Sequence, residues 1–222
     1  NCFSIKDGKK LWSYETEKSF INSYKKSSII IKDKKIFFTN SLGDITALDI
    51  YEGKIIWQFS TLSSNSFEDV MNLRMSSLIE DRDSIYFSNN LGNFYSIDLK
   101  SGTVNWMQKI NSNIKPAVIN DLIFTISEDG FLFVIEKNTG NIIRITNLSY
   151  KSNFKKLNTI ESTGFIMNNS DLYVSTKNGN LLVVSIKTGK IVNVIKIDRG
   201  KISRSFVFSQ NMYLIRDNSI IK

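Results

Sequence analysis

The chain has 222 residues, 41% of them apolar and 23% charged, so its composition excludes a disordered polymer and it should bury a core. No apolar run reaches the roughly 20 residues of a membrane-spanning helix, and the single cysteine, Cys2, excludes an internal disulfide framework. The net charge of +8 would suit nucleic acid, an anionic membrane surface or an acidic partner, but the lysines are scattered through predicted turns, so we expect no nucleic-acid partner.

A repeat is the dominant feature of the sequence. Four pairs of glycines share a spacing of ten residues: Gly43 and Gly53, Gly92 and Gly102, Gly130 and Gly140, and Gly179 and Gly189. Short β-branched and aromatic runs surround each pair in the same order, and turn residues separate the runs. This pattern indicates short strands joined by hairpins, repeated along the chain.

Each repeat predicts four strands in chain order. In the first complete unit, a strand at 28–32 is followed by strands at 36–38, 44–49 and 54–57. The first strands of the later units are expected at 74–79, 116–119, 164–167 and 205–209. The predicted blade units are approximately 27–59, 74–108, 116–146, 164–196, and 205–222 together with 1–14. We expect them to form one domain, 1–222, that is incomplete at its N-terminus.

The second glycine of each pair has a local role, because a tight turn often needs positive φ and Gly adopts it without a Cβ penalty. A carboxylate or hydroxyl stands four residues before each second glycine, for example at Asp49 and Asp98. Such a side chain can accept backbone N–H bonds across the turn. We therefore interpret Asp49 and Asp98 as turn acceptors and not as catalytic acids.

These units predict an all-β fold, a β-propeller of four-stranded antiparallel blades. A unit of four short strands, repeated about every 45 residues, cannot bury both of its faces alone, so the units must stack face to face. About five blades are present when the partial copies at the two chain ends are joined.

The string from Gly43 to Trp57 resembles the PQQ-like repeat. It reads Gly-x-hydrophobic-x-Ala-hydrophobic-Asp-x-x-x-Gly-x-x-x-Trp, a pattern found in quinoprotein dehydrogenases and in BamB, a lipoprotein of the machinery that assembles outer-membrane β-barrels. The resemblance extends over essentially the whole chain. BamB-type rings have eight blades, so the resemblance implies either a part of such a ring or a smaller closed ring.

The same resemblance assigns a role to three tryptophans. Trp12, Trp57 and Trp106 stand at the position where the family docks one blade onto the next. Arg144 and Asn193 occupy this position in the last two units. We expect those two blades to stack less tightly against their neighbours.

Two loops are more specific to the BamB type, whose members carry Leu-x-Leu-Arg ahead of one blade and Asp-x-Asp ahead of the next, both used to grip the barrel-assembly protein BamA. Here Met71, Leu73 and Arg74 precede the second unit, and Asn111 and Asn113 precede the third. The resemblance implies a BamA-like partner at these residues. The alternative is that Met71 and Leu73 are ordinary loop anchors that pack under the blade.

The function implied is a non-catalytic scaffold for protein–protein interactions that supports insertion of β-barrel proteins. It implies the periplasmic face of the outer membrane, reached through a lipid anchor upstream of this chain. The alternatives are a fragment of a PQQ-dependent quinoprotein dehydrogenase and a propeller used as a sensor or interaction domain. The chain lacks His and the vicinal Cys pair of a quinoprotein, so we expect no enzyme activity, no cofactor and no metal.

Overall fold

The computed structural model describes residues 1–16, 28–40, 42–61, 73–151, 157–158 and 160–222. Throughout these residues the regular structure is β-strand, and none of them belongs to a helix. Consequently, no helix of a length and hydrophobicity that could cross a membrane occurs in these ranges. The chain divides into two compact units, Asn1–Lys109 and Ile110–Lys222, which are described one at a time.

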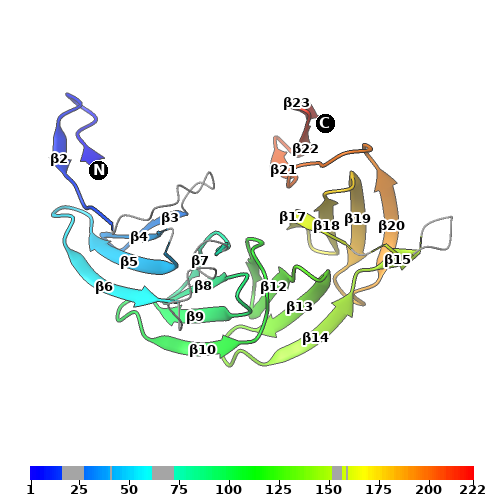
Figure 1. Ribbon diagram of the computed structural model, residues 1–222, viewed down its shortest axis with the longest axis horizontal. Helices are drawn as coiled ribbons and strands as arrows, with labels where there is room; N and C mark the ends of the chain where they lie inside the picture. The colour runs from blue at the N-terminus through cyan, green and yellow to red at the C-terminus, as the bar shows by residue number, and fades with distance from the viewer. Residues whose placement is uncertain (17–27, 41, 62–72, 152–156, 159) are drawn as a thin grey trace. The chain divides into compact units, whose positions relative to one another are not determined.

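The first unit contains two four-stranded antiparallel sheets and one two-stranded sheet (Figure 1). In both larger sheets the strands lie in chain order, so each strand pairs with the one before it through a hairpin. The strands are β1 (Cys2–Phe3), β2 (Lys10–Trp12), β3 (Ile29–Lys32), β4 (Lys35–Thr39), β5 (Asp44–Asp49), β6 (Ile55–Ser60), β7 (Ile79–Asp81), β8 (Ser84–Ser88), β9 (Phe94–Asp98) and β10 (Val104–Gln108).

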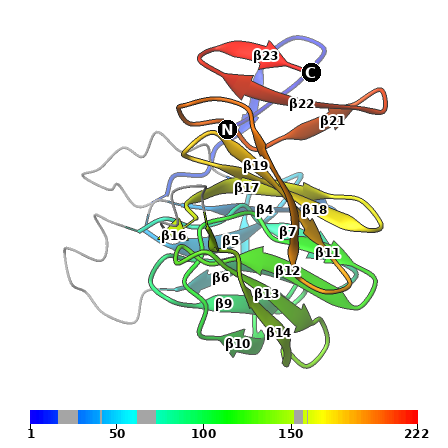
Figure 2. The ribbon, with the colours of Figure 1, turned by 90° about the vertical axis from the view of Figure 1, so that its right-hand side faces the viewer.

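The second unit contains two more four-stranded sheets, a two-stranded hairpin and a three-stranded sheet. Figure 2 shows β12, β13 and β14 side by side in chain order. The strands are β11 (Ala117–Ile119), β12 (Leu122–Ile126), β13 (Phe131–Glu136), β14 (Ile142–Asn147), β15 (Tyr150–Lys151), β16 (Leu157–Asn158), β17 (Ser162–Met167), β18 (Asp171–Thr176), β19 (Asn180–Ser185), β20 (Ile191–Lys196), β21 (Phe206–Phe208), β22 (Asn211–Arg216) and β23 (Ser219–Ile221).

The predicted first strand at 74–79 is wrong in extent, because β7 covers only Ile79–Asp81. Ahead of β7, Met75 forms a single bridge with Asn89. The Ser76 hydroxyl accepts the N–H of Ser88 at 2.9 Å, a bond that a backbone carbonyl would accept in a regular ladder. The Ser76 N–H donates to the Ser88 carbonyl at 2.8 Å, so one backbone bond of the pair is kept while the return bond goes to a side chain, and the regular ladder begins only at Ile79.

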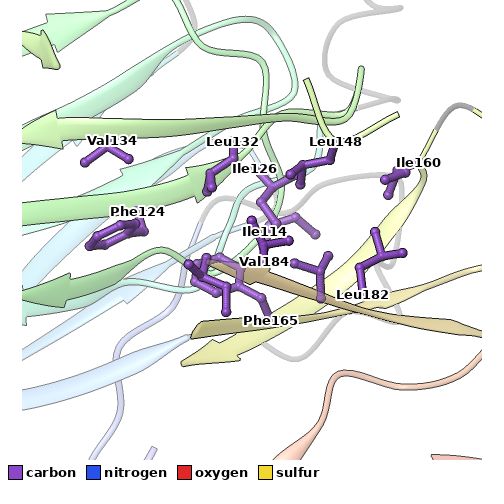
Figure 3. Packing of buried hydrophobic residues seen from close by; sticks show 12 residues of the cluster. Ile114, Phe124, Ile126, Leu132, Val134, Leu148, Ile160, Phe165, Leu182 and Val184 are labelled. Carbon is purple, nitrogen blue, oxygen red and sulfur yellow. The ribbon is translucent and has the colours of Figure 1, made fainter. Parts of the chain in front are cut away.

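Each unit buries its core between neighbouring sheets. In the second unit, side chains of β12 and β13 such as Phe124 and Leu132 meet side chains of β17 and β19 such as Phe165 and Leu182 (Figure 3). Each of these four is at most 2% exposed, and burying such a side chain stabilises the fold by about 1.5–3 kcal/mol. Four-stranded sheets that cover each other's faces confirm the predicted all-β propeller class.

The hairpin turns after β5 and β9 are built as the sequence predicts. Asp98 Oδ1 accepts the N–H groups of Lys100 and Ser101 at 3.0 and 2.7 Å, and the Asp98 carbonyl accepts the Gly102 N–H at 2.9 Å. Gly102 has φ +75°, the region that favours glycine. Asp49 caps its turn in the same way, through two bonds of 2.8 Å, so both aspartates are turn acceptors.

Tryptophan docks one sheet of the first unit onto the next. Trp57 donates its Nε1–H to the Leu99 carbonyl at 3.3 Å, and its ring lies over Gly102, where an added Cβ would come within 2.6 Å of it. Trp12 repeats this arrangement on Gly53. Trp106 stacks on Phe94 of its own sheet, with ring centroids 5.9 Å apart.

In the second unit Arg144 takes the place of the tryptophan and connects one sheet to the next. Its Nη2 donates to the Ile186 carbonyl at 2.6 Å and its Nη1 to the Lys187 carbonyl at 2.9 Å. Ile186 follows the third strand of its sheet as Leu99 does in the first unit, so the acceptor is equivalent. Two hydrogen bonds from one guanidinium, a polar fork, therefore join these two sheets at the position where the sequence led us to expect looser stacking.

Candidate partner-binding loops

The loop that leads into β7 fixes the backbone of Arg74 and leaves its side chain exposed. The Arg74 N–H donates to Asn90 Oδ1 at 2.6 Å, and the Arg74 carbonyl accepts the Asn90 N–H at 3.0 Å. Leu73, next to it, is half buried and packs against the core of the first unit. Of the three residues predicted here, Leu73 is thus an anchor, Arg74 projects outward, and Met71 lies outside the described residues.

The loop that leads into β11 is tied down at three points. The Asn111 carbonyl accepts the Glu128 N–H at 2.9 Å, Asn113 Nδ2 donates to Glu128 Oε1 at 2.7 Å, and the buried Ser112 hydroxyl donates to the Ile126 carbonyl at 2.7 Å. Asn111 is half buried and its Oδ1 is fully buried. Asn113 is half buried as well, and its amide is paired with the exposed Glu128, so a surface contact by Asn113 would involve this pair.

A third loop, leading into β17, has the same construction. The Glu161 carbonyl accepts the Lys177 N–H at 2.9 Å, and the side chains of these two residues form an ion pair. The hydrogen bond from Lys177 lowers the pKa of the Glu161 carboxyl from its ordinary value. In all three loops, then, one residue is held through its backbone by the turn between the second and third strands.

From the sequence we did not identify the three residues that hold these loops, which are Asn90, Glu128 and Lys177. Asn90 and Glu128 stand two residues after the last residue of the second strand of their sheets, and Lys177 stands one residue after it. A position just after the second strand is therefore the signal that could have identified them. Arg74 belongs to the first compact unit, and Asn111 and Asn113 belong to the second. The contacts that hold each loop come from residues of its own unit.

Catalytic or metal-binding groups do not gather in these loops. Among the described residues, no three His, Cys, Asp or Glu side chains form a set that could hold a metal ion. The neighbouring carboxylates Glu80, Asp81 and Asp83 belong to the β7–β8 hairpin, where Asp81 pairs with Ser84. The loops offer one exposed guanidinium, amides and a lysine–glutamate pair, which are groups for hydrogen bonding to a partner.

Comparison with known proteins gives one family and several similar folds. Residues 2–146 match the family model described as outer membrane protein assembly factor BamB. The crystal structure of BamB from Moraxella catarrhalis matches with a TM-score of 0.78 and 16% identity, over 98% of this chain and 64% of that one. No curated protein sequence matches.

Two further solved structures are similar. The computationally designed Ika8 protein has a TM-score of 0.64 and 12% identity, over 86% of this chain and 56% of its own. The WD40 domain of Pan2 from Neurospora crassa has a TM-score of 0.60 and 14% identity, over 85% and 55%. The chain thus spans less than two thirds of each structure, and at these identities the likenesses show the fold alone. The family model, in contrast, matches more than half of the sequence, and on this ground the chain belongs to the family of the outer membrane protein assembly factor BamB.

Proposed function

We propose that the chain is a non-catalytic scaffold that holds a barrel-assembly protein and so supports insertion of β-barrel proteins into the outer membrane. The observation that carries this proposal is Arg74, whose side chain is exposed while its backbone is fixed from both sides by Asn90. The backbone of an arginine held in this way loses little further freedom on binding, and its guanidinium presents a planar set of donors to a carboxylate or carbonyl. Arginine is also among the residues that most often dominate binding energy at interfaces.

The partner that we propose is a BamA-like barrel-assembly protein, bound through Arg74 on one loop and Asn113 on the next. Leu73 would support Arg74 from beneath, which combines the two sequence interpretations of this loop. Asn113 is itself hydrogen-bonded to Glu128, so a partner would meet a polar pair. The blade units 27–59, 74–108, 116–146, 164–196 and 205–222 with 1–14 remain our proposal for how the sheets divide within one propeller domain.

The proposed address is the periplasmic face of the outer membrane, with a lipid anchor outside the printed sequence as the attachment. Membership in the BamB family supports this address. The absence of His from the sequence supports a role without catalysis, because His is the commonest general base. The use of Asp49 and Asp98 as turn caps also supports it, since these two carboxylates are occupied in hairpins.

The test is binding of the full chain to the periplasmic region of the barrel-assembly protein from the same organism. Arg74→Glu should weaken binding by about tenfold or more, since an interface arginine commonly contributes more than 1 kcal/mol. Lys54→Glu is the matched control, because Lys54 is an exposed cation of the same unit in a hairpin turn, paired only with Glu52. Equal affinity for wild type and Arg74→Glu would exclude this loop, and no binding by wild type would exclude the function.

A further inference from the structure

The positive charge of the chain is concentrated in its last third. Residues 151–222 contain 12 Lys and Arg against four Asp and Glu, which accounts for the whole net charge of +8, while residues 1–150 are neutral overall. The scatter of lysines along the sequence conceals this imbalance. The cations of a single part of the second unit are therefore available to create a local positive field.

Many of these cations lie at one end of the sheets β17–β20 and β21–β23. This end carries the β18–β19 turn, the loop 197–205 that leads into β21, and the β22–β23 turn. Six cations stand there against three carboxylates: Lys177, Lys196, Arg199, Lys201, Arg204 and Arg216, with Glu161, Asp198 and Asp217. Two of the carboxylates are already engaged, Glu161 by Lys177 and Asp198 by Arg216 at 3.3 Å.

The loop 197–205 is held firmly in place. The Asp198 N–H donates to the Gly179 carbonyl at 3.0 Å, and the Ser203 N–H donates to the Ile215 carbonyl at 2.9 Å. Ile202 is fully buried. Gly179 has no room for a side chain, since an added Cβ would lie 2.3 Å from the Asp198 carbonyl oxygen. The backbone that carries the charged residues is thus fixed by contacts to the β18–β19 turn and to β22.

Three cations of this loop form no ion pair with the other described residues. Arg199, Lys201 and Arg204 are exposed, and none of the ion pairs formed by the described residues includes them. Arg204 is oriented by its own stem, which lies over Gly164, and by a bond from Nε to the Phe165 carbonyl at 2.9 Å. These contacts hold the stem and the Nε of Arg204 in one orientation.

We propose that this loop, through Arg199, Lys201 and Arg204, is a docking surface for an acidic segment of a protein partner. Charge complementarity favours a partner surface that is negatively charged. The fixed backbone and the oriented guanidinium of Arg204 favour a protein, because a fork of donors held in one geometry matches a carboxylate that is itself held in place. The inference deepens the proposed function: the barrel-assembly protein would present acidic residues to this loop.

The experiment compares two pairs of charge reversals in the full chain. Arg199→Glu with Lys201→Glu changes the loop, and Lys187→Glu with Lys190→Glu makes the same charge change in the β19–β20 turn, at the opposite end of the same sheet. Affinity for the periplasmic region of the barrel-assembly protein should fall about tenfold or more for the first pair and at most about twofold for the control. Wild-type affinity should also fall between about 0.1 M and about 1 M salt. Equal losses in both pairs, or none in either, would overturn the proposal.

A second probe, poly-L-glutamate, separates this surface from the proposed function. Suppose that wild type does not bind the barrel-assembly protein but does bind poly-L-glutamate, and that only the Arg199/Lys201 pair of substitutions abolishes binding of poly-L-glutamate. The proposed function then fails, and the docking surface for acidic segments stands. If poly-L-glutamate does not bind, while vesicles containing phosphatidylglycerol do and phosphatidylcholine vesicles do not, the surface recognises a membrane and the proposal is wrong. Thermal unfolding of each variant checks that the fold is intact.

Discussion

Replacing Arg144 tests whether its hydrogen bonds stabilise the contact between two sheets, as the docking tryptophan does in the first unit. Arg144→Ala removes two charged hydrogen bonds, of 2.6 Å to Ile186 and 2.9 Å to Lys187. Bonds of this kind contribute about 1.5–3 kcal/mol each, and because water can reach the partly exposed acceptors, we expect the second unit to lose about 1–3 kcal/mol. Arg144→Lys should fall between Ala and wild type, since an ammonium cannot reproduce the fork.

The assay for Arg144 is urea unfolding combined with hydrogen exchange of two amides in the docked turn. The Ser185 N–H donates to the Lys190 carbonyl at 2.9 Å and the Gly189 N–H to the Ser185 carbonyl at 2.7 Å, so both should exchange faster when the fork is lost. Lys187→Ala is the control, because Lys187 takes part through its carbonyl alone. A loss under about 0.5 kcal/mol for Arg144→Ala, within the range of ordinary surface changes, would refute the reasoning.

Two further predictions concern the hairpin turns. Gly102→Ala should destabilise the chain by at least about 1 kcal/mol more than Gly92→Ala, because both residues have positive φ but only at Gly102 does an added Cβ meet a neighbour, Trp57 at 2.6 Å; similar losses in urea unfolding would show that the ring moves aside freely. Backbone N–H groups lower the pKa of Asp98 below its ordinary 3.8, so its contribution is present above that pH and is lost as the pH falls through the lower folded-state value. The stability difference between wild type and Asp98→Asn should accordingly shrink below about pH 4, and a difference independent of pH would contradict this account.

The repeat could be predicted from sequence because its signals are local. A glycine at positive φ, with an acceptor four residues earlier, specifies its hairpin through contacts inside a handful of residues, as at Asp98 and Gly102. Other tight turns contain no glycine: Ser209 and Gln210 have φ of 47° and 63°. Such turns were found through the strands that flank them, since their own residues give a weaker signal.

The contacts between sheets were harder to predict. Arg144 was read as the loss of a tryptophan, because its two acceptors lie about 40 residues away in the chain and their spacing is visible only in the folded sheet. The same limit applies to Arg204, which Gly164 and Phe165 orient from a different sheet. The predicted extent of a strand was wrong where a side chain took over one bond of the ladder, as the Ser76 hydroxyl does ahead of β7.

The backbone attachment of Arg74, Asn111 and Glu161 has a consequence for how this family can diversify. Each is secured by its own carbonyl, which every amino acid possesses, and not by the chemistry of its side chain. A single codon change at such a position can replace a cation by an amide or an anion without disturbing the neighbouring strands. The residues that contact a partner can therefore change in one blade at a time, while the contacts that stabilise the fold stay the same.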